Sequence, residues 1–97
     1  MAKIAKKKKN DNLYYAILAL QTPEECMAFF EDLCTIRELK DISQRLDIAV
    51  LLHDGLNYQE VAAQTGVSST TISRVKRCLE YGSGGYQIAI DRLERKA

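Results

Sequence analysis

A run of hydroxyl-bearing and basic side chains between Asn57 and Leu79 has the chemistry needed to contact nucleic acid. Hydroxyl and guanidinium groups can pair with base edges in the major groove, and basic side chains neutralise phosphates. No Asp or Glu stands between Val61 and Leu79, so no carboxylate in that span would repel a DNA backbone. We expect base-edge contacts from Ser68, Ser69, Thr70 and Ser73. We expect mainly phosphate contacts from Gln59, Lys76 and Arg77, and we expect Arg74 to belong to the same DNA-binding set.

Two short helices and the turn between them must position these side chains. Asn57 is a favourable N-cap, and Glu60 stands three residues later, where its carboxylate can reach the Asn57 backbone N–H. Gly66 suits a sharp turn after the first helix because glycine takes a positive φ without steric cost. Val67 supplies an apolar side chain that can fix the turn. This pattern predicts the first half of a helix-turn-helix.

The second helix of the motif is predicted from a cap and an apolar stripe. Ser68 can cap it, and an apolar residue recurs at helical spacing at Ile72, Val75 and Leu79. Because that stripe faces inward, the polar side chains remain on the outer side, where they can read a major groove. The alternative interpretation is a short helical hairpin whose polar face is only solvated.

The net charge of +1 conceals an uneven distribution of charge along the chain. Five of the 14 basic residues form a run near the N-terminus: Lys3, Lys6, Lys7, Lys8 and Lys9. The other nine basic residues stand against 13 acidic ones, so the rest of the chain is mildly acidic. We expect residues 1–11 to be a flexible basic arm that can add phosphate contacts without reading sequence, and residues 12–97 to form one domain.

Composition favours a small all-α domain in the cytoplasm and gives no sign of an enzyme. The 97 residues include one Pro and five Gly, and no apolar run approaches the ~20 residues that cross a bilayer. No secretory signal is expected either, because no apolar stretch follows the basic run.

Cys26, Cys34 and Cys78 lack metal-ligand spacing and are expected to be reduced, mostly buried thiols. The lone His53 has no evident metal partner, so we expect no metal, no cofactor and no catalytic residues.

Four further helices are expected outside the motif. Residues 12–20 are amphipathic, and Thr22 and Thr35 each stand three residues before a Glu as in a capping box. A glycine-rich loop is expected over residues 80–86, and the last helix is expected over residues 86–97, with Ile88, Ile90 and Leu93 on or near its buried side. The first two helices carry more apolar residues than one small subunit can cover: Leu13, Tyr14, Ile17, Phe29, Phe30 and Leu33. This excess predicts burial between two copies of the chain.

Six helices, with the motif fourth and fifth and a Gly-Gly loop before the last, resemble the Trp repressor family. More narrowly, the chain is similar to the YerC/YecD-type branch of Trp repressor-like proteins over roughly residues 12 to 94. The matching residues are Thr35-Ile-Arg-Glu-Leu39, Arg45, Gly55 and Thr71-Ile-Ser-Arg74. The resemblance implies an intertwined homodimer whose first two helices wrap around the partner. A related helix-turn-helix occurs in the DNA-binding domain of the replication initiator DnaA.

The resemblance also implies a ligand clamp formed by Thr35, Arg45 and Arg74, because the Trp repressor holds tryptophan with the matching positions. An Arg pair can hold a carboxylate. Val75 and Cys78 stand where the family has a glycine and a serine, so we expect any small-molecule effector not to be tryptophan. The alternative is that Arg45 pairs with Asp41 or Asp47 and that Arg74 contacts only phosphate.

These features together favour a homodimeric regulator of transcription that binds double-stranded DNA and represses by occupying a promoter. Two motifs related by a two-fold axis would read half-sites about 34–36 Å apart. The alternative function is a helical dimerisation or interaction protein whose helix-turn-helix contacts protein. Only DNA binding should weaken steeply as salt rises, so a salt series separates the two.

Overall fold

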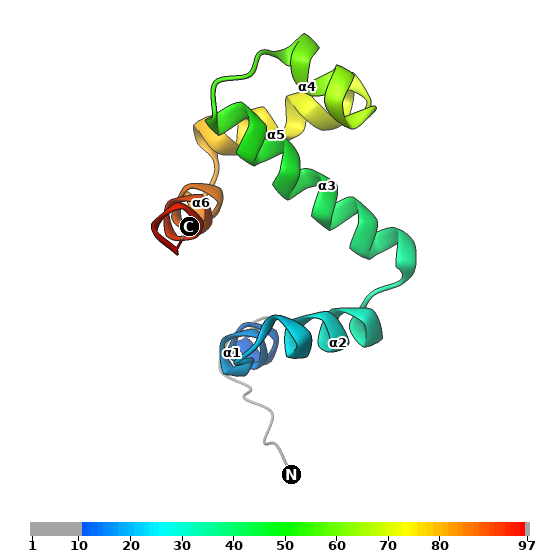
Figure 1. The fold of residues 1–97 in the computed structure, drawn as a ribbon, viewed down its shortest axis with the longest axis vertical. Helices are drawn as coiled ribbons and strands as arrows, with labels where there is room; N and C mark the ends of the chain where they lie inside the picture. The colour runs from blue at the N-terminus through cyan, green and yellow to red at the C-terminus, as the bar shows by residue number, and fades with distance from the viewer. Residues whose placement is uncertain (1–10, 97) are drawn as a thin grey trace. The chain divides into compact units, whose positions relative to one another are not determined.

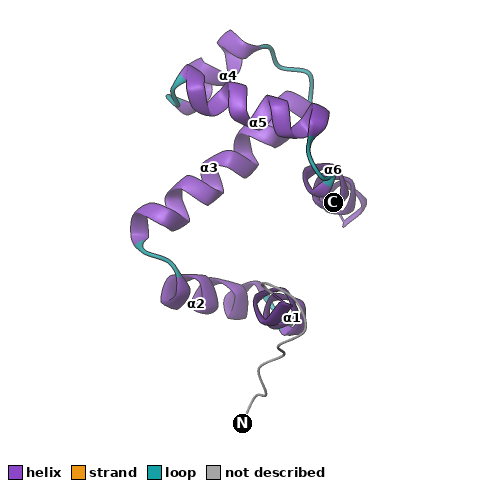
Figure 2. Cartoon of the chain, turned by 180° about the vertical axis from the view of Figure 1, so that it is seen from behind, coloured by secondary structure: helices purple, strands orange, loops and turns teal. Residues whose placement is uncertain are grey.

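The computed structural model describes residues 11–96, and all regular secondary structure in that range is helical (Figures 1 and 2). The helices are α1 (Asp11–Ala19), α2 (Pro23–Leu33), α3 (Ile36–His53), α4 (Tyr58–Thr65), α5 (Ser69–Tyr81) and α6 (Gly85–Lys96). The prediction of six helices is therefore confirmed. The chain divides into two compact units, one that ends at Leu39 and one that begins at Lys40. None of the described helices is both long and apolar enough to span a membrane.

Capping side chains begin α2 and α3 where the sequence predicts. Thr22 Oγ1 accepts a hydrogen bond from the Glu25 N–H at 3.1 Å, and Pro23 occupies the first helical position. Thr35 and Glu38 form a reciprocal box, with the Thr35 N–H donating to Glu38 Oε1 at 2.9 Å and the Glu38 N–H donating to Thr35 Oγ1 at 3.1 Å. Hydrogen bonds from the Thr35 backbone and side chain lower the pKa of Glu38. This cap is therefore intact above the usual Glu pKa and weakens as pH falls through the lowered one.

Some helix boundaries differ by one or two residues from the expected ones. Asp11, assigned to the basic arm, is the first residue of α1, and the five lysines of that arm lie outside the described residues. α5 continues through Glu80 and Tyr81, which were expected in the loop, because Gly82 is the residue that ends the helix. α6 begins at Gly85, one residue early.

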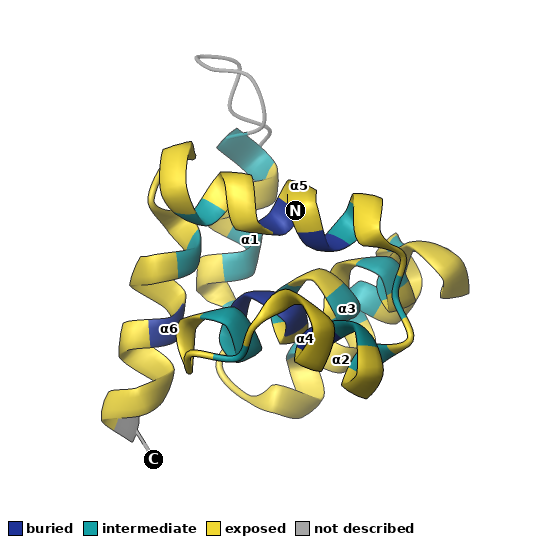
Figure 3. Cartoon of the chain, turned by 90° about the horizontal axis from the view of Figure 1, so that it is seen from above, coloured by how far each residue is buried: buried dark blue, intermediate teal, exposed yellow. Residues whose placement is uncertain are grey.

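The core of the second unit consists of six buried aliphatic side chains from four helices (Figure 3). They are Ile48, Ala49, Val61, Ile72, Val75 and Ile90. Val67 and Leu79 pack against this cluster, as the spacing predicts. Ile90 is the only buried residue among those of α6 whose side chains are described. Ile88 and Leu93, which were expected on or near the buried side, each remain 53% exposed. α6 therefore packs against the core through only a few of its side chains.

The helices of the first unit leave much apolar surface uncovered in a single chain. No residue of α1 or α2 is buried, and Phe29 and Phe30 are only partly covered, with their rings in edge-to-face contact at 5.5 Å. The large apolar side chains exposed on α1, on α2 and at the start of α3 are Leu13, Tyr14, Tyr15, Leu18, Met27, Leu33 and Ile36. Of the six residues predicted as the apolar excess, Leu13, Tyr14 and Leu33 are exposed, whereas Ile17, Phe29 and Phe30 are partly covered.

The cysteines are free thiols, but the expectation that they are mostly buried is wrong for the single chain. Cys26 and Cys34 are partly exposed, and Cys78 is exposed. Cys78 follows Val75 by three residues, yet it lies outside the stripe through which α5 packs on the core. A thiol at that position is left in contact with solvent.

Candidate nucleic-acid interface

The first helix of the motif, α4, starts and stops at the predicted residues. The Asn57 N–H donates to Glu60 Oε1 and the Glu60 N–H donates to Asn57 Oδ1, each at 2.9 Å. At the other end Gly66 has φ 67° and ψ 13°, and its N–H donates to the carbonyl oxygen of Ala62 at 2.9 Å. The predicted capping box and glycine turn are both confirmed.

The turn is fixed by a threonine that sequence inspection did not single out. The Thr65 hydroxyl donates to the carbonyl oxygen of Val61 at 2.8 Å and accepts from the Val67 N–H at 3.3 Å. Val67 is thereby held over the core, where it is partly buried. The sequence indicates the apolar contact but not the hydroxyl that positions it.

Ser68 caps α5, and this use restricts its availability to DNA. Its Oγ accepts from the Thr71 N–H at 3.4 Å and lies 3.3 Å from Thr71 Oγ1, where either hydroxyl can be the donor. A base edge that Ser68 contacts would have to share this hydroxyl with the helix cap.

The other predicted contact residues lie on the exposed side of the motif. Ile72 and Val75 are 0% and 1% exposed, so the opposite side of α5 carries its polar residues outward. The exposed residues among those predicted to contact DNA are Gln59, Ser68, Ser69, Thr70, Ser73, Arg74, Lys76 and Arg77. The apolar side of α5 is thus buried, and its hydroxyl and basic side chains are exposed.

Two residues that were not predicted belong to the same surface. Glu80 and Tyr81 line a shallow hollow with Ser73, Lys76 and Arg77. The Tyr81 side chain is 81% exposed. The sequence could have indicated Tyr81, because it stands four residues after Arg77 and eight residues after Ser73. This spacing places all three residues on one helix face. Glu80 adds the one acidic group of α5 to this surface.

The three residues of the implied ligand clamp lie in different surroundings. Arg45 lines an open hollow of about 570 Å³ together with Cys78 and residues 82–86, and Arg74 is not among its lining residues. The hydroxyl and N–H of Thr35 are engaged by Glu38, in the other compact unit. Val75 belongs to the buried core and does not line the hollow. Among described residues Arg45 forms no ion pair, so the alternative pairing with a neighbouring aspartate is wrong here.

Comparisons with known protein families, sequences and structures each match most of the length of this chain. The family described as Trp repressor protein matches residues 8–94. The uncharacterized protein YerC of Bacillus subtilis (strain 168) is 48% identical over 87 residues, which are 90% of this chain and 84% of YerC. A crystal structure of a candidate Trp repressor from Staphylococcus aureus aligns with a TM-score of 0.83 and 44% identity, covering 87% of this chain and 84% of the other. A TrpR-like protein from Eubacterium eligens ATCC 27750 aligns with a TM-score of 0.82 and 44% identity, covering 87% of both chains.

Proposed function

Because this chain belongs to the Trp repressor protein family, we propose that it is a sequence-specific DNA-binding regulator that represses transcription as a homodimer. The family is one of DNA-binding regulators rather than enzymes. The observation that carries the proposal is α5, whose apolar side is buried while its hydroxyl and basic side chains are exposed. We propose a cytoplasmic protein that blocks a promoter by occupying it.

In the proposed mechanism α5 enters the major groove of double-stranded DNA. Ser69, Thr70 and Ser73 approach base edges, and Ser68 joins them if its cap bond is shared. Gln59 on α4 and Arg74, Lys76 and Arg77 on α5 hold phosphates and so fix the register of the helix. A partner copy places a second α5 about 34–36 Å away, one turn of DNA along the same face.

The uncovered apolar side chains of α1 and α2 support the homodimer. Contiguous apolar surface on an isolated chain marks an interaction site, and closed two-fold dimers are the commonest assembly of soluble proteins. The partner in this proposal is a second copy of the chain, whose α1 and α2 supply an equally apolar surface.

Arg77→Ala is expected to weaken binding to every DNA sequence alike and to reduce the salt slope of the binding constant by about 1, because it removes one phosphate contact. Thr70→Ala is expected instead to change affinity by about 1–3 kcal/mol at particular base positions only. Fluorescence anisotropy with DNA selected from a random library, repeated over a salt series, measures both.

Arg92→Ala is the matched control, because Arg92 is an exposed arginine on α6 outside the motif. It should leave affinity and salt slope near those of the parent. If Thr70→Ala and Arg77→Ala also leave affinity for all DNA unchanged, the motif does not read DNA. Partner binding that is insensitive to salt would then favour the protein-interaction alternative.

Free tryptophan is expected not to act as a corepressor of this protein. In the hollow beside Arg45 a ligand carboxylate meets one guanidinium rather than two, and the thiol of Cys78 is a weak hydrogen-bond partner. Calorimetry at millimolar tryptophan should show no saturable binding. Saturable binding that also tightens DNA binding would contradict the prediction, provided that Arg45→Ala abolishes it. Val75→Gly is not a clean test, because it would open the core.

A further inference from the structure

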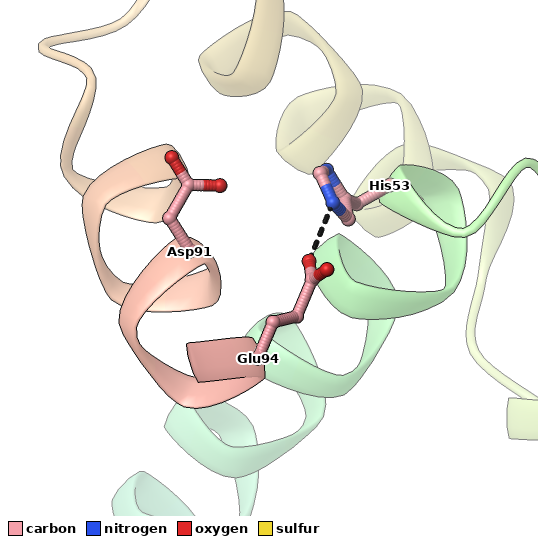
Figure 4. Close-up of side chains that lie close together, drawn as sticks. All are labelled: His53, Asp91 and Glu94. Carbon is pink, nitrogen blue, oxygen red and sulfur yellow. Dashed lines mark ion pairs between the residues drawn. The ribbon is translucent and has the colours of Figure 1, made fainter. Parts of the chain in front are cut away.

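Three metal-ligating side chains converge on one side of the second unit. His53 is the last residue of α3, and Asp91 and Glu94 stand three residues apart on α6 (Figure 4). His53 Nε2 lies 2.8 Å from Glu94 Oε1, and one ligand atom from each of the three residues lies within 4.8 Å of the others. Asp91 and Glu94 share a helix face because of their spacing, and the end of α3 brings the imidazole to it.

The carboxylates of this cluster are not paired with basic side chains of the described part of the chain. Neither carboxylate forms an ion pair with a lysine or arginine among the described residues, and the only ion pair that either makes is the one with His53. Gln87 Nε2 donates to Asp91 Oδ1 at 2.9 Å, which steadies that carboxylate and leaves its other oxygen available. Even with a protonated imidazole, two carboxylates leave a residual negative charge. The cluster is therefore electrostatically suited to a cation.

We propose that His53, Asp91 and Glu94 form a binding site for a divalent transition-metal ion such as Mn²⁺ or Zn²⁺. One imidazole and two carboxylates are a ligand set that suits these ions, and three protein ligands leave further positions for water. The ion would take the place of a proton between His53 Nε2 and Glu94 Oε1, since both atoms must offer lone pairs to the metal. All three residues are exposed, so the ion can enter directly from solvent.

Such an ion would tie α6 to the end of α3. Among the described side chains of α6, Ile90 alone is buried, so coordination at Asp91 and at Glu94, which lies one turn beyond Ile90, would add a second attachment. His53 also precedes the short connection to Asn57, where the helix-turn-helix begins. Metal binding would therefore stabilise the folded second unit by mass action.

The chain contains one histidine, and this makes the test direct. Mn²⁺ is added to the full-length protein without a histidine tag, and this ion is used because it prefers oxygen and nitrogen ligands to the three free thiols. We expect calorimetry to give one site per chain. We expect substoichiometric Mn²⁺ to broaden the NMR signals of the His53 ring before those of other exposed side chains, and the thermal midpoint to rise with Mn²⁺.

Glu94→Gln and Asp91→Asn keep the side-chain shape and remove one ligand charge each. Both should weaken Mn²⁺ binding at least about tenfold, the loss that even an outer-shell partner typically causes, with an unchanged helical circular dichroism spectrum. Asp47→Asn is the matched control, since it removes the same charge from α3 about 9 Å along the axis from His53 and should leave binding unchanged. Equal Mn²⁺ affinity in the parent and in Glu94→Gln, or His53 signals that broaden no earlier than the rest, would overturn the proposal.

Discussion

Ile72→Ala is expected to lower the free energy of unfolding by about 2–5 kcal/mol, the range for truncating a large aliphatic side chain in a core. Ile72 is 0% exposed and packs with buried residues from α3, α4 and α6 as well as with its own helix. Its removal would leave a cavity at the point where these helices meet. Small domains are stable by only about 5–15 kcal/mol, so this loss would be a large share of the total stability.

Urea denaturation followed by circular dichroism measures the effect, at one fixed protein concentration because association shifts apparent stability. Ile88→Ala is the matched control, since it makes the same exchange on α6 at a side chain that is 53% exposed. The control should cost well under 1 kcal/mol. Equal losses at the two positions would show that Ile72 does not occupy the core.

Leu18→Glu is expected to dissociate the proposed homodimer and to leave the single chain folded. Leu18 is 77% exposed in one chain, where a carboxylate would remain in water at little cost. In a dimer that covers α1, the same charge would be buried without a partner at a cost of several kcal/mol. The dimer dissociation constant should therefore rise at least about 100-fold. Affinity for a two-half-site operator should fall with it.

Light scattering at micromolar concentration should give about twice the chain mass of 11.0 kDa for the parent and about that mass for the variant. Gln21→Glu is the control, because it adds the same charge at an exposed polar position just after α1. It should remain dimeric. A parent protein that is monomeric at this concentration, or a Leu18→Glu variant that stays dimeric, would exclude an interface over this part of α1.

The helix-turn-helix could be predicted from the sequence because its signals are local. Asn57 and Glu60 bond to each other, Gly66 takes the positive φ expected of it, and the stripe that includes Ile72 faces the core. None of these needs knowledge of a distant residue. The same reasoning misplaced Tyr81, because a glycine-rich loop signal does not say which glycine ends the preceding helix.

The features that escaped prediction depend on residues far apart in the chain. His53 lacked a metal partner in its own neighbourhood, and only the packing of α6 brings Asp91 and Glu94 to it. The exposure of Cys78 depends on which side of α5 the core covers. The clamp implied by family resemblance is a third case, because Arg45 and Cys78 share a hollow whose lining does not include Arg74.

The N-terminal caps of α2, α3 and α4 have a consequence for how the protein forms. Each cap joins residues that are three positions apart, so it can close before any long-range contact exists. Short closures of this kind speed folding, whereas burial of Ile48 against Ile90 must wait for most of the chain to be made. Covering the apolar side chains of α1 needs another molecule in the proposed dimer. In the proposed dimer, formation of the active protein then has two stages. Folding of the single chain is unimolecular and is governed by its sequence. Association of two chains is bimolecular, so its rate depends on the concentration of the chain in the cell.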